Sequence, residues 1–201
     1  HVLNEKPFFN TEYAMNVAET ASTFAEQICS DASVRAAESA AEKITLLDTK
    51  IQNAIAMFMN IHARYIFETN FYKERQKGLV SAERLDELME AAQKESYKDA
   101  LSEYHPSFWA SKLHFYIAEV PFYNFPYTFG YLFSLGIYHL SLKEGKAFEE
   151  KYIALLQDTA AMTTEELAMK HLGVDLTKPD FWQAGVDLAI ADVEEFLDLT
   201  K

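Results

Sequence analysis

ITLLDTKIQNAIAMFMNIHARYIFETNFYKER, residues 44–75, carries the strongest structural signal in this chain of 201 residues. It lies within residues 8–77, a run that contains neither Gly nor Pro, the two residues that most often interrupt helices. Its apolar side chains recur at helical spacing, at Ile44, Leu47, Ile51, Ala54, Ile55, Phe58, Ile61, Tyr65 and Phe71. We therefore predict one long helix that begins near Ser33, continues to Lys77 and is ended by Gly78.

Helical patterns also occupy most of the remaining chain. Asn10 or Thr11 is expected to cap a first helix that ends near Ser30. Further helices are expected over residues 81–101, 124–143, 145–158, 163–171 and 177–199. Residues 113–120 alternate enough to predict one short extended segment. The predicted fold class is all-α, and residues 1–201 are expected to form a single helical lobe without repeats or linkers.

Composition and charge exclude several classes of protein. The formal net charge of -13 argues against nucleic acid and anionic membrane surfaces as partners, because both bind basic proteins. The lone Cys29 cannot form an internal disulfide, so a cytoplasmic location is expected. The sequence starts at His1 rather than Met, which suggests a fragment of a longer protein.

Residues 120–142 contain no Asp, Glu, Lys or Arg and are long enough to cross a bilayer. The same stretch nevertheless holds two Pro, an Asn, a His, two Ser, a Thr and four Tyr. These polar residues favour a buried helix preceded by an irregular segment over a span exposed to lipid. No membrane association is expected.

Residues 114–131, HFYIAEVPFYNFPYTFGY, form the densest cluster of polar aromatic residues. One histidine and four tyrosines lie within it: His114, Tyr116, Tyr123, Tyr127 and Tyr131. Each ring can pack, and each OH or NH group needs a hydrogen-bond partner. Such a cluster can line a cleft and donate hydrogen bonds to a peptide carbonyl. For Tyr116 and Tyr131, a role as core aromatics with satisfied hydroxyls is an equal alternative.

Several kinds of catalytic site are missing from the sequence. No histidine follows a glutamate by three positions, as a di-iron helical bundle would require. The HExxH motif of zinc hydrolases is also absent, so no complete site of that kind lies in these residues. Cys29 follows Ile28 in a helical pattern, which indicates a buried structural thiol rather than a nucleophile.

Two segments together resemble a known family. The first is YAMNVAETASTFAE, residues 13–26; the second is His114-Phe-Tyr followed by Pro121-Phe-Tyr and Tyr127. They resemble the oligoendopeptidase F branch of the thimet-oligopeptidase superfamily of zinc peptidases, in the expected order and over nearly the whole chain. The chain departs from the family pattern at residues 117–120, which lengthen the stretch between the two His/Tyr pieces.

The resemblance implies a division of roles between the two segments. Glu19 would be the third zinc ligand, while the two histidine ligands and the glutamate base would belong to an HExxH preceding His1. The residues that would bind the substrate backbone and stabilise the oxyanion are His114, Tyr123 and Tyr127, with Tyr116 and Tyr131 as further candidates. Without the resemblance, Glu12, Glu19 and Glu26 recur every seven residues and are typical of a solvated acidic helix face.

The resulting prediction is the C-terminal part of a zinc-dependent oligoendopeptidase. Its partners would be short peptide substrates and the preceding part of the same protein, and Zn2+ would be its cofactor. This chain alone is expected to be inactive. One alternative is a non-catalytic, all-helical module that binds a peptide or another ligand in the aromatic stretch. A purely structural helical domain is a further alternative.

Overall fold

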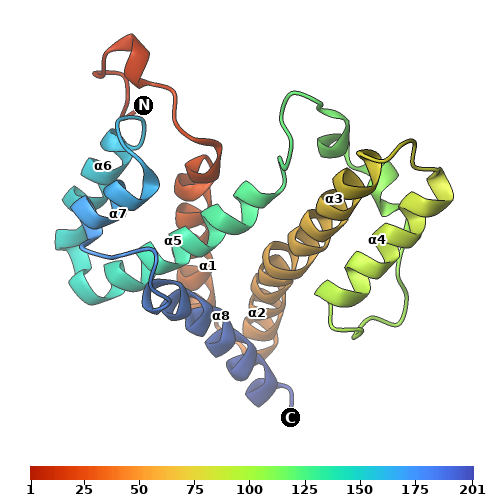
Figure 1. The fold of residues 1–201 in the computed structure, drawn as a ribbon. Helices are drawn as coiled ribbons and strands as arrows, with labels where there is room; N and C mark the ends of the chain where they lie inside the picture. The colour runs from red at the N-terminus through yellow and green to blue at the C-terminus, as the bar shows by residue number, and fades with distance from the viewer. The chain divides into compact units, whose positions relative to one another are not determined.

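A computed structural model describes residues 1–201 (Figure 1). All regular elements are helices and no strand is present, which confirms the predicted all-α class. The chain divides into two compact units. Unit 1 comprises His1–Gln52 and Phe129–Lys201, and unit 2 comprises Asn53–Thr128. That residues 1–201 form a single lobe stays a prediction.

Unit 1 is built around an aromatic and aliphatic core. Its helices, with the unit boundaries falling inside α2 and α5, are α1 (Thr20–Ala36), α2 (Ala40–Ile55), α5 (Phe125–Glu144), α6 (Phe148–Asp158), α7 (Thr164–Leu172) and α8 (Asp180–Leu199). The core residues come from five of these helices: Phe24, Phe133, Ile137, Tyr138, Phe148, Leu155, Leu167, Ala168 and Phe181. Burial of such side chains is the main favourable term in folding.

Unit 2 packs two long helices against short turns. Its elements are a π-helical turn (Ala56–Asn60), α3 (Ile61–Arg75), α4 (Ala82–Ser96) and two 3-10 segments (Pro106–Ser111 and Leu113–Tyr116). The core of the unit consists of Phe67, Leu88, Met89 and Ala92. Phe108, Trp109 and Phe115 from the 3-10 segments pack against this core and hold the aromatic stretch on α3 and α4.

Several predicted helix ends are confirmed by their capping contacts. The Ser81 hydroxyl accepts a hydrogen bond from the Arg84 amide at the start of α4. Thr163 and Glu166 form a reciprocal capping box at the start of α7. Gly173 ends α7 at φ 68°, a left-handed conformation that glycine adopts without steric cost.

The predicted extended segment at residues 113–120 was wrong. Leu113–Tyr116 forms a 3-10 turn, and the residues after it form further turns. The Phe115 amide donates to the Lys112 carbonyl at 3.2 Å, and the Val120 amide to the Ile117 carbonyl at 3.2 Å. Because backbone groups pair locally and no neighbouring strand exists, the alternating pattern does not produce a strand.

The predicted helix from Ser33 to Lys77 was wrong in its start and its continuity. α1 continues through Ser33 to Ala36, and α2 begins at Ala40. The Ser39 hydroxyl accepts from the Glu42 amide at 3.2 Å, while the Glu42 carboxylate accepts from the Glu38 amide at 2.9 Å. These contacts stop α1 and start α2, and the Ser-x-x-Glu spacing was a signal for them.

The first helix begins at Thr20, later than predicted. The preceding residues form a 3-10 turn at Met15–Val17. Asn16 donates to the Thr164 hydroxyl of α7 at 3.0 Å, a contact that holds this segment in unit 1 outside the helix. Glu12 therefore does not share a helix face with Glu26, and the predicted acidic face is incomplete.

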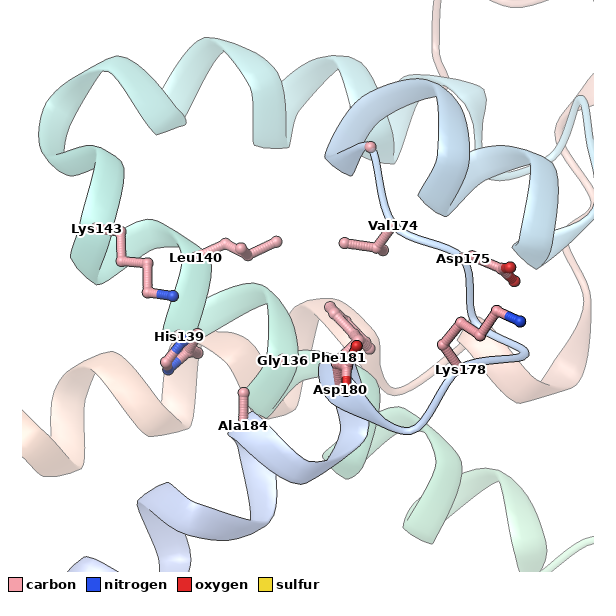
Figure 2. A pocket seen from close by; sticks show the side chains of 11 residues that line it. Gly136, His139, Leu140, Lys143, Val174, Asp175, Lys178, Asp180, Phe181 and Ala184 are labelled. Atoms are coloured by element: carbon pink, nitrogen blue, oxygen red, sulfur yellow. The ribbon is translucent and has the colours of Figure 1, made fainter.

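α5 and α8 cross closely in unit 1 beside a cavity of about 340 Å³. An added Cβ on Gly136 would lie 2.3 Å from the ring of Phe181, so only glycine permits this contact. His139, Lys143 and Lys178 lie around the same cavity (Figure 2). None of the predicted site residues lines it.

No helix in the structure combines the length and apolar character that a bilayer span requires.

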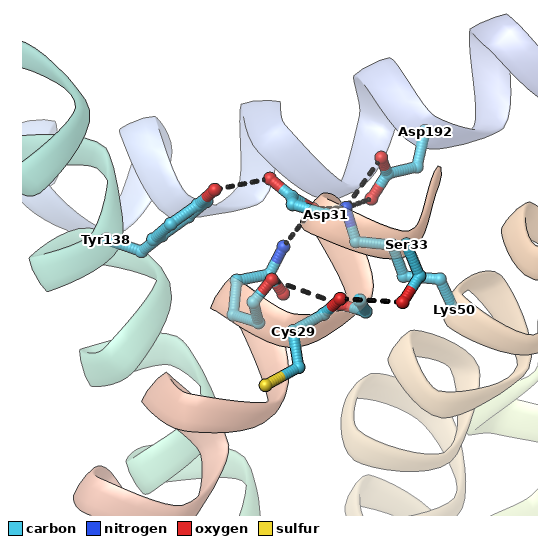
Figure 3. Close-up of polar contacts among 8 residues, drawn as sticks. Cys29, Asp31, Ser33, Lys50, Tyr138 and Asp192 are labelled. Carbon is cyan, nitrogen blue, oxygen red and sulfur yellow. Dashed lines mark hydrogen bonds and ion pairs between the residues drawn. The ribbon is translucent and has the colours of Figure 1, made fainter. Parts of the chain in front are cut away.

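A half-buried ionic network joins four helices of unit 1 (Figure 3). The Lys50 ammonium of α2 pairs with Asp31 of α1 and, at 2.8 Å, with Asp192 of α8. The Tyr138 hydroxyl of α5 donates to Asp31 at 2.6 Å. Burial raises the pKa of Asp192, and the hydrogen bond from Lys50 opposes this effect. The network therefore depends on Lys50 to compensate two carboxylates that are largely removed from water.

Asp158 makes the fold of unit 1 sensitive to acid. Its carboxylate accepts from Lys170 at 2.7 Å, His171 at 2.9 Å and Lys6 at 3.3 Å. The hydrogen bond from Lys170 is the largest of the contributions that lower the pKa of Asp158 to about 2. Because the pKa is lower in the folded state, the stabilisation is present above the usual value of 3.8 and is lost as pH falls towards 2.

We expect Asp158→Asn to lower the free energy of unfolding by about 1 kcal/mol at pH 7, since the cluster is partly screened by solvent. The difference from the unsubstituted chain should shrink between pH 4 and pH 2 as Asp158 becomes protonated. Urea unfolding followed by circular dichroism at several pH values measures this. Asp198→Asn, which removes an exposed pair with Lys201, is the matched control. A stability difference that does not change with pH would contradict the assignment of this stabilisation to the ionised Asp158 carboxylate.

Candidate active site

Three predicted site residues meet in unit 2. The Nε2 atom of His114 lies 3.2 Å from the hydroxyl of Tyr127, a hydrogen-bond distance. The imidazole stacks on Tyr123, with ring centroids 5.2 Å apart and planes 29° apart. It meets Tyr127 edge-on, at 5.8 Å and 84°. All three side chains are half-buried, so they form one polar aromatic cluster that retains some access to solvent.

The surroundings of His114 favour the neutral form of its imidazole. Burial lowers the pKa of His114, and the nearby cations Arg64 and Lys112 lower it further. Its Nδ1 atom is buried and has no hydrogen-bond partner. A buried polar atom without a partner is uncommon and needs an explanation. A neutral imidazole and a phenol beside it can donate hydrogen bonds to a carbonyl oxygen without bringing a full charge.

Tyr116 lies apart from these three rings. Its hydroxyl donates to the Ala110 carbonyl at 3.3 Å, and 59% of the residue is exposed. The ring lines a cavity of about 230 Å³ whose other walls are Phe67, Glu68, Phe71, Tyr72, Leu85, Trp109 and Phe115. The structure therefore places Tyr116 beside an apolar cavity rather than in the cluster around His114.

Glu19 lies in unit 1, immediately before the first residue of α1. An added Cβ on Gly130 would lie 2.9 Å from the Cβ of Glu19, so α5 approaches the Glu19 backbone as closely as glycine allows. The Thr23 hydroxyl lies 2.7 Å from the Glu19 carbonyl and 3.3 Å from that of Gly130. Ser22 donates to the Glu19 carboxylate at 2.9 Å, which leaves the other carboxylate oxygen for a further ligand.

Tyr131 is buried in unit 1, with 4% of its surface exposed. Burial raises its pKa well above the usual range, and the carboxylates of Asp192, Asp31 and Glu26 raise it further. These surroundings are those of a core tyrosine. A contact between Tyr131 and substrate stays a prediction.

The residues present fit one part of a zinc site only. Catalytic zinc takes three protein ligands and an open position for water. No group of three His, Cys, Asp or Glu side chains in the chain could hold a metal ion. Glu19 has the carboxylate chemistry and a free oxygen, so it could supply one ligand to a set completed by residues outside this chain.

Comparison with known proteins identifies the family. The sequence model of peptidase family M3 matches residues 3–188, which is most of the chain. The chain belongs to peptidase family M3. The predicted resemblance to zinc oligopeptidases is confirmed at this level. No match to the chain was found among curated proteins.

Two solved structures share the fold of this family M3 chain. One is a protein of Chlamydophila abortus provisionally named a peptidase, with TM-score 0.80 and 22% identity. The other is oligoendopeptidase-F from Enterococcus faecium, with TM-score 0.76 and 21% identity. Each alignment covers 96% of this chain but only 32% and 37% of the respective structures. The family M3 chain thus spans about a third of the length of these structures.

Sequence reasoning missed two polar residues that border the cluster. Glu68 is 3% exposed and accepts from the Phe122 amide at 2.7 Å. Asn124 is 1% exposed and accepts from Arg64 at 3.0 Å. Arg64 lies four residues before Glu68 on α3. The available signal was the pair of opposite charges at Arg64 and Glu68, four residues apart in one helical pattern.

Proposed function

We propose that this chain forms part of a zinc-dependent peptidase that hydrolyses short peptides. Membership of peptidase family M3 supports the reaction class. The single observation that carries the proposal is the cluster of His114, Tyr123 and Tyr127 in unit 2, because it gathers neutral hydrogen-bond donors at one place. Substrate length, the metal and the roles of individual residues are part of the proposal.

Glu19 is proposed as one ligand of the zinc ion. The other ligands and the general base would come from a preceding part of the same protein. When bound in such a site, zinc activates a water molecule for attack on a peptide carbonyl. The contribution of this chain is to hold the Glu19 carboxylate in place through Ser22 and the tight contact with Gly130.

His114, Tyr123 and Tyr127 are proposed to bind the substrate backbone. A developing oxyanion is stabilised best by donors that are already oriented before the reaction. The stacking of His114 on Tyr123 and its contact with the Tyr127 hydroxyl provide that orientation within unit 2. Tyr116 and Tyr131 are proposed as weaker contributors, since one is largely exposed and the other is buried.

The proposal predicts different results for the longer protein and for this chain. The longer protein should cleave a short quenched-fluorescent peptide and contain about one zinc per molecule, the number that such catalytic sites hold. Glu19→Ala should lower both the zinc content and the activity. The loss should exceed the roughly 10- to 100-fold that follows when a residue hydrogen-bonded to a metal ligand is removed. Glu26→Ala, an exposed glutamate on α1, is the matched control.

Purified residues 1–201 alone should show no cleavage with added zinc, because they offer no group of three ligands. Zinc-dependent cleavage by these residues would contradict this expectation. A longer protein that keeps its zinc and its activity after Glu19→Ala would contradict the role of Glu19. Elemental analysis of the zinc content and initial rates of peptide cleavage test both expectations.

A non-catalytic binding module is the second candidate function. The observation that favours it is the cavity of about 230 Å³ in unit 2, which has aromatic walls and borders Tyr116. Cavities of this kind bind apolar ligand groups. Saturable binding of peptides by a longer protein that holds no zinc and cleaves none of them would favour this function over the peptidase.

A further inference from the structure

The turn that carries Tyr123 is strained. Phe122 has φ 57°, in the left-handed region that bulky residues seldom adopt. Only two other residues besides glycine have positive φ, Lys98 and Asp99, and both lie in an exposed turn. A conformation of this kind persists only where surrounding contacts hold it. The contacts around Phe122 must therefore stabilise this backbone conformation.

Glu68 of α3 holds Phe122 from one side. Its buried Oε1 accepts from the Phe122 amide at 2.7 Å, while its Oε2 is buried without a partner in hydrogen-bond geometry. The Phe122 ring packs against Tyr65 and Tyr72 of the same helix, at centroid distances of 5.5 and 5.4 Å. Burial raises the pKa of the Glu68 carboxylate, and the Tyr72 hydroxyl, which also interacts with this carboxylate, lowers the pKa against that larger effect. A buried carboxylate needs such partners, and its hydrogen bond from the Phe122 amide is the contact that reaches the turn.

Arg64, four residues earlier on α3, holds the other side of the turn. Its Nη1 donates to the Oδ1 of Asn124 at 3.0 Å. Its Nε donates to the Oδ1 of Asn60 at 2.9 Å, which fixes the guanidinium. Residues four apart on a helix lie on the same face, so Arg64 and Glu68 present opposite charges to the same turn.

Tyr123 lies between the two residues that are held. With Phe122 bonded through its amide and Asn124 through its side chain, the backbone of Tyr123 is fixed on both sides. Its ring then stacks on His114 at 5.2 Å. We infer that Glu68 and Arg64 are positioning residues that clamp the Phe122–Asn124 turn and so set the Tyr123 ring against His114. The clamp is independent of the proposed function, but its catalytic consequence rests on that function.

The clamp can be tested in the 201-residue chain without any activity assay. Histidine labelled with ¹³C reports the ring environment of His114 by NMR, and a His114→Gln spectrum assigns its signal. Glu68→Leu fills a similar volume but removes the acceptor. We expect it to remove the ring-current shift that Tyr123 imposes on His114 and to leave the His171 signal in unit 1 unchanged. Glu68→Gln removes the charge but keeps an acceptor, and we expect it to retain the His114 signal.

Two outcomes would overturn the clamp. One is a folded Glu68→Leu chain with an unchanged His114 signal, and the other is a Glu68→Gln chain that loses the signal as Glu68→Leu does. Should Glu68→Leu fail to fold, Asn124→Leu gives the decision, since it removes the acceptor of Arg64 and leaves the Arg64 charge and Glu68 in place. An unchanged His114 signal in folded Asn124→Leu would overturn the clamp.

The proposed function can fail while the clamp stands. In the longer protein, Glu68→Leu should lower kcat and Glu68→Gln should preserve it. If the NMR results hold and the longer protein hydrolyses no peptide, the clamp is correct and the peptidase proposal is wrong. If the longer protein is a peptidase but the His114 signal does not respond, the clamp is wrong and the peptidase proposal is unaffected.

Discussion

Replacing Lys50 with methionine is expected to lower the free energy of unfolding by about 3 kcal/mol, the lower end of the range for removing one partner of a buried ion pair. Methionine keeps most of the volume of lysine but removes the cation that Asp31 and Asp192 share. Asp31 keeps hydrogen bonds from Tyr138 and Gln27, so Asp192 is the carboxylate left uncompensated. The lower end of the range applies because the side chains of Asp31 and Asp192 remain 16% and 19% exposed to solvent. Urea unfolding of the chain, followed by circular dichroism, measures the change.

Lys43→Met is the matched control for this substitution. Lys43 also lies on α2 and also pairs with a residue of α8, Glu195, but both side chains of that pair are more exposed. Exposed pairs contribute about 0–1 kcal/mol, so the control should change stability little. Equal effects of the two substitutions would contradict the importance of burial in the network around Lys50.

The pH dependence of the Lys50→Met variant provides a second measurement. Burial raises the pKa of Asp192, so the folded state takes up a proton there more readily than the unfolded state. Without Lys50 this effect should grow, and the variant should recover stability as the pH is lowered from 7 towards 5. A variant that loses stability over this range would show that Asp192 is not the group left uncompensated.

Removing the Tyr127 hydroxyl is expected to have a large effect on the activity of the longer protein. In the longer protein, Tyr127→Phe should lower kcat by roughly 100- to 1,000-fold, as loss of an oxyanion donor does in other hydrolases. KM should change much less, because the donor acts mainly on charge that develops in the transition state. Initial rates with a quenched-fluorescent peptide over a range of concentrations separate the two constants.

Tyr104→Phe is the matched control for the loss of a hydroxyl. Tyr104 belongs to the same unit, and its hydroxyl contacts Asp99 and the Leu101 amide in a turn away from His114. The control should keep kcat close to that of the unsubstituted protein. If Tyr127→Phe instead raised KM and left kcat unchanged, Tyr127 would bind substrate without stabilising the transition state.

Local signals in the sequence were sufficient for most helices and caps. Ser81, the Thr163–Glu166 capping box and Gly173 act within a few residues of themselves, so their patterns predicted the ends of α4 and α7 correctly. The Ser39–Glu42 cap was equally local but lay inside a continuous helical pattern and was overlooked. The segment at residues 113–120 failed because an alternating pattern makes a strand only where a neighbouring strand can pair with it.

The candidate site likewise has features that the sequence indicated and features that only the structure shows. The residue types, their order and the resemblance to zinc oligopeptidases selected Glu19 and the residues around His114 as candidates, whose roles stay predictions. The family is confirmed. Contacts between distant residues were not predictable, such as Glu68 with Phe122 or Lys50 with Asp192. The buried position of Tyr131 and the exposed position of Tyr116 were equally hidden.

The all-α class, the helix caps and the family can thus be read from the chain alone, because each depends on residues close together in sequence or on a motif. The pairing of His114 with Tyr127, the clamp on the Phe122–Asn124 turn and the Lys50 network emerge only in the folded units. Their partners are separated by 13 to 142 positions. Long-range packing brings such groups together and removes the water that would otherwise solvate them, and this burial sets the strength of their interactions.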